Sequence, residues 1–564
     1  MKTTATILAA LTAATALQAQ VMQTEITVDR TVLPQLAPSS PLSSVRITLP
    51  AATGTATLAP SPFDGDLTLS PTTDSIGATI AGPLPESTPW RGYASLGYFP
   101  VYRLWAQAGY RIIDTKATCL QAAARFGGAS YHADAAGERF TISDNNFGID
   151  ATLFQTIGSH QLSASLAYAH TALSSPTFMG IKQNQGYNSI VGSVDFGKIR
   201  QSYAYSAKLK IDRLAATDKI EMGPRNPYLE PGANTAIDLA LNGRISSASG
   251  KIGGLLELGL RHLDSEGYEL IRWFNEQPAF RATANPSMNI WNIKPQVQFR
   301  GQKYDIRVGA NVDFTHGTDY RFSSRIAPAV DIAWMPVDRI SATVSYNGWR
   351  DYNSLRRLFD YSPYITPLAL GGVRSNTDIQ ATVEYNQGVG FRAGASGGYR
   401  AADRTAMPLI VNGLEVLAFE AVDMNQLWFK ISAGYTFRWA GLDIGADFRT
   451  GTSGYSHGNP DDLDRAKIVA NAHVALSPVE KLRVRIGWQL RSGRHYYTGS
   501  STPNTISTVD MDAICDINIG AGYSLSERLS LAFDARNLLC RKAETIPGLP
   551  GQGLQALLSA TYRF

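Results

Sequence analysis

Histidine and cysteine are the residue types best suited to metal binding and nucleophilic chemistry, and the chain has only eight and three of them. The histidines show no paired spacing of the kind that zinc sites use. Cys119, Cys515 and Cys540 are too few and too scattered for a disulfide framework. The sequence also contains no nucleophile elbow and no phosphate-binding loop. We therefore predict a protein that is not an enzyme and that uses no metal and no cofactor.

Charged side chains recur at every second position in several segments of the chain. Lys208 and Lys210, for example, alternate with Tyr205, Ala207 and Leu209. Because a period of two places the two sets on opposite faces of a strand, we predict that the charged face lines a polar lumen or a docking surface. Solvated charges that neutralise one another across neighbouring strands explain the pattern equally well, and the mixed signs argue against a strongly ion-selective pore. The predicted lumen-facing charges are Lys208, Lys210, Lys303, Asp305, Arg307, Asp443, Asp447, Arg449, Arg483 and Arg485.

Aromatic side chains concentrate in two of the segments that connect the alternating stretches. In the second of them, residues 355–359 read Leu-Arg-Arg-Leu-Phe, which predicts one short amphipathic turn of helix. Loops of this kind bind sugars or hydrophobic ligands, but loops that fold onto each other to close a mouth are the simpler explanation. The residues are Tyr268, Trp273, Phe274 and Phe280 in one segment, and Tyr352, Phe359, Tyr361 and Tyr364 in the other.

The composition shows what kind of element must position these side chains. Of 564 residues, 44% are hydrophobic and only 17% are charged, and the net charge of +4 gives no case for a nucleic-acid binder. Beyond the N-terminus no run approaches the roughly 20 apolar residues of a spanning helix. Instead, 22 runs alternate with period two. Most last about 10–14 residues, which is longer than a typical soluble strand and suits a tilted strand that crosses a bilayer.

The connections between these runs are unequal in length. After even-numbered runs they are tight, as at 157–159, 336–337 and 478–479. After odd-numbered runs many are long: 173–186, 215–233, 266–287, 350–373, 401–423 and 493–508. Short periplasmic turns and long outer loops are typical of outer-membrane barrels. The sequence therefore predicts an all-β fold, a transmembrane antiparallel β-barrel of about 22 strands over residues 91–564, in contact with the lipid of the bacterial outer membrane.

The N-terminal 90 residues differ from the rest. Residues 1–19 have the positive start, the apolar stretch and the small final residues of a signal peptide, with cleavage predicted between Ala19 and Gln20. Residues 20–90 are rich in Pro, Thr and Ser, and proline at this density breaks helices and sheet ladders. We predict a periplasmic extension here, either a tether or a reduced plug.

The C-terminal end carries a resemblance to a known family. A final Phe564 with Tyr562 two residues earlier is similar to the signal that barrel-assembly machinery recognises. Residues 529–564, with a strand ending in Asn537-Leu538, a loop rich in Gly and Pro, and a closing strand, resemble the end of TonB-dependent receptors. Residues 91–100 also resemble exported barrel proteins of Bacteroidetes-type bacteria. The resemblance implies a 22-strand barrel that acts in solute passage.

The resemblance also implies partners and a departure. Thr24, Glu25, Ile26, Thr27 and Val28 resemble a TonB box, the short strand that pairs with the energising protein TonB by strand addition. Family members carry a globular plug of well over a hundred residues inside the barrel, whereas residues 20–90 are fewer and proline-rich. We therefore expect a barrel for solute passage or for partner-gated transport. The alternatives are a passive porin and a structural or assembly barrel that anchors a periplasmic partner through residues 20–90.

Overall fold

The computed structural model describes most of the chain from Trp90 to Phe564. The described residues are 90–564 apart from 100–102, 136–137, 177–181, 201, 219, 222–227, 230–231, 248, 267, 275–276, 285–286, 319, 362–372, 387–389, 413–415, 438, 452–465, 501–505, 545–550 and 552. The predicted signal peptide, its cleavage residues Ala19 and Gln20, the TonB-box-like strand Thr24–Val28 and nearly all of the 20–90 extension lie outside them.

Within the described residues, 22 strands form one continuous antiparallel wall. The first eleven are β1 (Gly92–Phe99), β2 (Arg103–Asp114), β3 (Thr118–Ala135), β4 (Glu138–Ile157), β5 (His160–Pro176), β6 (Lys182–Ile199), β7 (Tyr203–Ala216), β10 (Ala233–Ser246), β11 (Ile252–Glu266), β14 (Ser287–Arg300) and β15 (Tyr304–Gly317). The others are β16 (Tyr320–Val337), β17 (Ile340–Tyr352), β18 (Val373–Asn386), β19 (Phe391–Asn412), β20 (Val416–Thr436), β21 (Ala440–Gly451), β22 (Ile468–Val479), β23 (Leu482–Ser492), β26 (Ile514–Ser524), β27 (Leu529–Arg536) and β28 (Gln555–Arg563).

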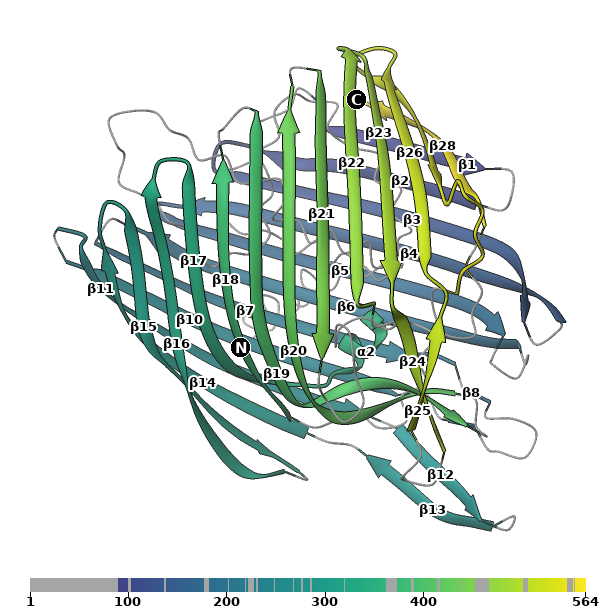
Figure 1. The fold of residues 1–564 in the computed structure, drawn as a ribbon, viewed down its shortest axis with the longest axis horizontal. Helices are drawn as coiled ribbons and strands as arrows, with labels where there is room; N and C mark the ends of the chain where they lie inside the picture. The colour runs from purple at the N-terminus through teal and green to yellow at the C-terminus, as the bar shows by residue number, and fades with distance from the viewer. Residues whose placement is uncertain are drawn as a thin grey trace, which may run out of the picture.

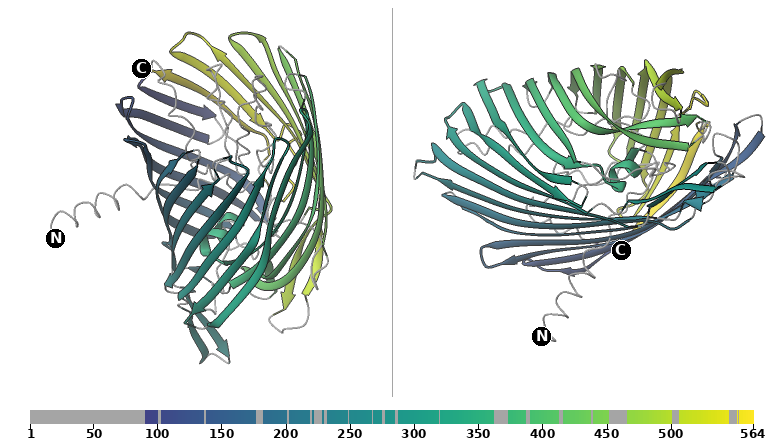
Figure 2. Two further views of the ribbon diagram at one scale, coloured as in Figure 1. Left: turned by 90° about the vertical axis from the view of Figure 1, so that its left-hand side faces the viewer. Right: turned by 90° about the horizontal axis from the view of Figure 1, so that it is seen from below.

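The wall closes on itself, since β1 pairs with both β2 and β28. Each strand otherwise pairs with the next barrel strand along the chain, as the ring of strands in Figures 1 and 2 shows. Closure leaves no strand edge without a partner, which is what a bilayer demands of every backbone N–H and C=O. The prediction of a closed 22-strand antiparallel barrel is confirmed.

The two ends of the barrel differ as the connection lengths predict. The short turns gather at the end that carries the C-terminus, at the top of Figure 1. The long connections lie at the opposite end and contain further elements, namely β8 (Ile220–Glu221), β9 (Tyr228–Leu229), β12 (Tyr268–Phe274), β13 (Gln277–Ala284), helix α2 (Leu355–Tyr361), β24 (Arg494–Ser500) and β25 (Ile506–Met511). Among the described residues, no helix is long and apolar enough to cross a membrane.

Several segments predicted as loops contain strands, such as β12 and β13 in the predicted loop 266–287. The predicted loop 401–423 is the far part of β19 and β20, which pair along most of their length. A shift of register between Ala402 and Thr405, where Arg404 has a positive φ of 57°, interrupts the period of two and hides this continuation from the sequence pattern. The predicted loop 493–508 holds the β24–β25 hairpin, while β23 pairs directly with β26. The predicted run 509–523 therefore joins the end of β25 to β26.

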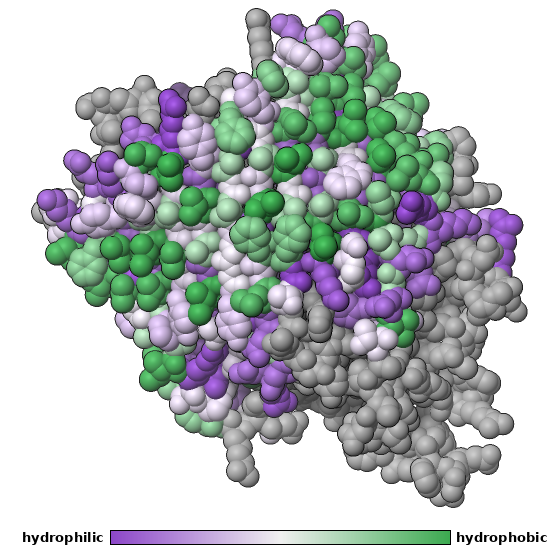
Figure 3. Space-filling model, viewed as in Figure 1, coloured by the Kyte–Doolittle hydropathy of each residue, from purple (hydrophilic) through white to green (hydrophobic). Residues whose placement is uncertain are grey.

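The outer surface of the barrel is apolar. Large hydrophobic side chains are exposed on nearly every barrel strand, for example Leu239 and Leu241 on β10, Val308 on β15 and Phe429 on β20. Hydrophobic residues spread across the wall in Figure 3. Exposed apolar side chains on so large a surface would be unfavourable in water, and they match the lipid-facing band of a transmembrane barrel. The buried apolar cluster of Leu263, Met288, Ile290, Tyr352 and Val373 lies instead at the end with the long connections.

Replacing Leu241 with Arg is expected to lower the free energy of unfolding by about 2–4 kcal/mol, because this is the cost of a cation on the lipid face near the middle of the bilayer. Leu241 is 42% exposed on the outer face of β10. The matched control is Asn242→Arg, because the neighbouring side chain is also exposed but points to the other face. Urea unfolding in lipid vesicles measures the free energy of unfolding of both variants. Equal losses in the two variants would contradict a lipid-facing position for Leu241.

Candidate functional site

The segment between β17 and β18 forms helix α2 and folds into the barrel. The helix spans Leu355–Tyr361, where the sequence predicts a short amphipathic turn. The Arg357 backbone N–H donates to Ser354 Oγ at 3.2 Å, which caps the helix start. Leu355 and Phe359, four residues apart on one face, are only 2% and 4% exposed. Figure 2 shows α2 inside the ring of strands.

An ion pair anchors α2 to the barrel wall. Arg356 Nη2 lies 2.7 Å from Asp212 Oδ1 on β7, and Arg356 Nε also donates to both oxygens of this carboxylate, at 3.1 and 3.2 Å. Arg356 further donates to Ser189 Oγ on β6. A guanidinium that binds a carboxylate through two nitrogens is both strong and specific in geometry. The segment that carries α2 leaves the wall at the end of β17, and the helix is bound to β6 and β7. The segment therefore extends across part of the lumen.

Two further contacts hold the same helix. The Leu355 backbone N–H donates to Asn234 Oδ1 on β10 at 2.6 Å, and the Asn234 amide in turn donates to Ser265 Oγ on β11 at 2.8 Å. The ring of Phe359 packs edge-on against Tyr187 of β6, with a centroid separation of 4.7 Å. Asn234 therefore satisfies a helix-terminal N–H that has no partner within the helix.

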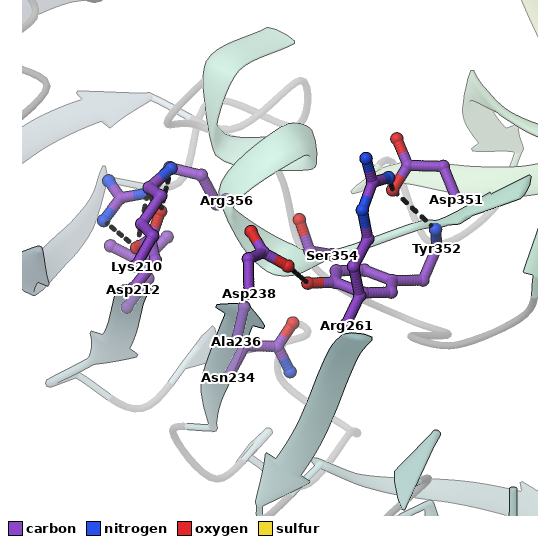
Figure 4. A pocket seen from close by; sticks show the side chains of 11 residues that line it. Lys210, Asp212, Asn234, Ala236, Asp238, Arg261, Asp351, Tyr352, Ser354 and Arg356 are labelled. Carbon is purple, nitrogen blue, oxygen red and sulfur yellow. Dashed lines mark hydrogen bonds and ion pairs between the residues drawn. The ribbon is translucent and has the colours of Figure 1, made fainter. Parts of the chain in front are cut away.

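A cavity of about 260 Å³ lies between α2 and the wall. It is lined by Tyr352, whose hydroxyl donates to Asp238 Oδ1 at 3.2 Å, and by Asp351, which lies 3.4 Å from Arg261 Nη1 (Figure 4). Arg374 of β18 binds the other oxygen of Asp351 at 3.4 Å. The lining residues are Lys210, Asp212, Leu214, Asn234, Ala236, Asp238, Arg261, Asp351, Tyr352, Ser354 and Arg356.

The docking of α2 is expected to weaken as pH rises, because of Asp360. Burial raises the pKa of this carboxyl to about 7, against the pull of Arg356, and Asp212, Lys210 and Arg357 also act on it. A carboxyl whose pKa is raised in the docked state favours docking when it is protonated. That advantage is complete at low pH and is lost as pH rises to about 7.

Planar-bilayer recordings of the whole protein test this pH dependence. Conductance at pH 8 should exceed conductance at pH 5. Asp360→Asn, which cannot ionise, should give the same conductance at both values. A wild-type protein whose conductance does not change with pH would contradict the role of Asp360.

The predicted lumen charges lie in several separate places, and only Lys210 joins the cavity. Lys210 lies 3.7 Å from Asp212, and Lys208 and Arg483 are half-buried on β7 and β23. Lys303 lies in the turn before β15 and donates to the Pro336 carbonyl. The others form ion pairs between or along strands: Asp305 with Arg300 and Arg307, Asp443 with Arg392, Asp447 with Arg449, and Arg485 with Asp534.

The predicted aromatic residues also separate. Tyr352 and Phe359 contact the wall residues Asp238 and Tyr187. Tyr268, Trp273 and Phe274 lie on β12, Phe280 lies on β13, and Tyr361 ends α2, but their side chains are outside the description. Tyr364 lies outside the described residues altogether.

Sequence reasoning missed most of the cavity. Asp212, Asn234, Asp238, Arg261 and Asp351 were not among the candidates, although the period of two puts Asp212 and Asp238 on the same face as Lys210. Their inward parity is the one signal that could have found them. The described residues contain no cluster of His, Cys, Asp and Glu suited to a metal ion.

A closed antiparallel barrel with an apolar exterior and charged residues on the inner face is the architecture of a bacterial outer-membrane protein. No family model and no curated protein matches the chain. Solved structures do match in fold. The chain is similar to the apoprotein of the FrpB iron transporter from Neisseria meningitidis, with a TM-score of 0.66 and 11% identity over 85% of this chain and 81% of that one.

Two other solved structures show the same similarity. The siderophore receptor PiuA from Acinetobacter baumannii has a TM-score of 0.61 and 10% identity over 85% of this chain and 82% of that one. The copper transporter OprC has a TM-score of 0.60 and 10% identity over 86% and 81%. These neighbours are TonB-dependent outer-membrane receptors, and their 22-strand barrel is the fold of this chain.

Proposed function

We propose that this protein is an outer-membrane transport barrel in which α2 restricts the passage of a solute. The observation that carries the proposal is the docking of α2 inside the barrel, through Arg356 to Asp212 and through Leu355 to Asn234. A barrel of 22 strands is wide enough for a large aqueous lumen, so an inward-folded segment reduces the free cross-section. The fold likeness to iron, copper and siderophore transporters supports a transport role.

The proposal extends to partners. Assembly machinery recognises the final strand through Tyr562 and Phe564, and Thr24–Val28 pairs with TonB or another periplasmic protein. The N-terminal arrangement, a cleaved peptide of residues 1–19 followed by a tether or reduced plug over residues 20–90, belongs to the same proposal. It is supported by the sequence patterns of these segments.

Planar-bilayer recordings of the purified protein test the proposal. We expect low conductance from the wild type and a clear rise when the α2 anchor is broken. A steady large conductance that does not respond to the anchor would indicate a passive porin instead. If neither the wild type nor the variant with a broken α2 anchor conducts, and a peptide of residues 20–90 captures a periplasmic protein, the structural role is favoured.

A TonB-deficient strain tests whether transport is energised. Substitution of Thr24–Val28 by a Gly-Ser stretch should reduce uptake to the level seen without TonB. If solute uptake persists unchanged both in the TonB-deficient strain and in the Thr24–Val28 variant, the energised mechanism is overturned, but passive transport is not.

A further inference from the structure

The cavity beneath α2 is built jointly by the wall and by the segment that carries the helix. Its floor comes from inward-facing residues of β7, β10 and β11, and its cover comes from Asp351, Tyr352, Ser354 and Arg356. At about 260 Å³ it is slightly below the usual range of small-molecule pockets, so it suits a ligand of monosaccharide size.

The charges that line this cavity balance. Its described lining contains three cations, Lys210, Arg261 and Arg356, and three carboxylates, Asp212, Asp238 and Asp351. Figure 4 shows Asp238 between the two arginines.

Five of these six charges lie in ion pairs, and the sixth, Asp238, accepts a hydrogen bond. Arg356 and Lys210 share Asp212, at 2.7 and 3.7 Å, and Arg261 lies 3.4 Å from Asp351. The carboxylate of Asp238 accepts the Tyr352 hydroxyl and is influenced by the charges of Arg261 and Lys210.

This balance decides which ligand can enter. A ligand carboxylate would have to compete with an existing ion pair, and a ligand ammonium with an ion pair or with the Tyr352 hydroxyl on Asp238. Either would leave a protein group without its partner, which is costly away from water. A hydroxyl group can instead add hydrogen bonds, because it both donates to carboxylate lone pairs and accepts from guanidinium or ammonium N–H groups. Adjacent hydroxyls also match the paired atoms of a carboxylate or a guanidinium.

We infer that the cavity beneath α2 binds a small, uncharged, polyhydroxylated solute of monosaccharide size. The inference rests on the proposed function, since it names the class of solute that the barrel takes up. Binding can nevertheless be measured without transport, so the two can fail separately.

The test uses three sugars of similar size and different charge: D-glucose, D-glucuronate and D-glucosamine. Isothermal titration calorimetry on the full chain in detergent is expected to show about tenfold tighter binding of glucose than of either charged sugar. Equal affinities, tighter binding of a charged sugar, or no binding of glucose would overturn the inference. In cells that contain TonB, glucose binding without any glucose uptake would contradict the transport role and leave the site intact, whereas uptake without binding would do the reverse.

Two variants that remove charges of opposite sign from the cavity make the test more specific. Asp351→Asn leaves Arg261 and Arg374 without their shared carboxylate, so the preference should shift toward glucuronate. Arg261→Gln removes a cation, so the preference should shift toward glucosamine. A general loss of folding would weaken the binding of all three sugars together. Shifts of the sugar preference in opposite directions therefore cannot come from misfolding.

The matched control is Asp447→Asn on β21. It removes a carboxylate from an arginine, Arg449, in the same way as Asp351→Asn, but the pair does not line the cavity. We expect its sugar preference to equal that of the wild type. A shift as large as that of Asp351→Asn would show that overall barrel charge, not the cavity, selects the ligand.

Discussion

Replacing Asp212 with Asn is expected to release α2 from the wall and to increase the conductance of the barrel strongly. The substitution leaves the Arg356 guanidinium, which is largely buried, without the carboxylate that it binds through two nitrogens. Breaking a buried pair by removing one partner costs about 3–5 kcal/mol. Even 3 kcal/mol changes the ratio of docked to undocked helix by about a hundredfold. Single-channel recordings should therefore change from rare openings to mainly open traces.

Two controls separate the anchor from a general effect of charge. The double variant Asp212→Asn with Arg356→Gln removes both charges, so no charge is buried alone, and its conductance should lie closer to that of the wild type. Asp443→Asn removes a carboxylate from Arg392 elsewhere in the wall and should leave the conductance unchanged. If Asp212→Asn conducts like the wild type, α2 does not restrict the lumen.

The barrel itself could be predicted from the sequence because its rule is local. Alternation along one strand is set by the two sides of that strand, lipid and lumen, and needs no knowledge of other strands. Where a strand departs from the rule, the prediction fails. At Arg404 the register shift changes which residues face outward, so the far parts of β19 and β20 looked like a loop.

The anchor of α2 could not be predicted in the same way. Arg356 and Asp212 are 144 residues apart, and their contact depends on how far the segment after β17 reaches across the barrel. The sequence shows that Arg356 lies in a short amphipathic turn and that Asp212 faces inward, but not that the two meet. Ion pairs between neighbouring strands are easier to predict from the sequence. Arg300 and Asp305, for example, are directly paired residues of β14 and β15.

Deleting Phe564 is expected to reduce the amount of folded barrel by at least about tenfold, because this residue completes the closure of the wall. Its backbone N–H donates to the Gly92 carbonyl at 2.9 Å and its carbonyl accepts from the Gly92 N–H at 2.8 Å. Its ring stacks on Tyr110 and on Tyr562, with centroids 6.3 Å apart in each case. Two hydrogen bonds and two ring contacts amount to roughly 3 kcal/mol. The heat-dependent shift of the folded protein on gels measures the loss.

Substitutions at the same seam separate its parts. Phe564→Ala keeps the two backbone hydrogen bonds with Gly92 and loses only the two ring contacts, so it should assemble better than the deletion variant. Phe564→Tyr should assemble as well as the wild type. Gly92→Ala should also impair closure, because a Cβ there would lie 2.6 Å from Cε2 of the Phe564 ring. Phe533→Ala, on the outer face of β27, removes an equal ring away from the seam and should assemble normally. Normal assembly of the deletion variant would mean that the pairing of β1 with β28 closes the barrel without its last residue, since that ladder runs from Tyr93 to Tyr98 on its own.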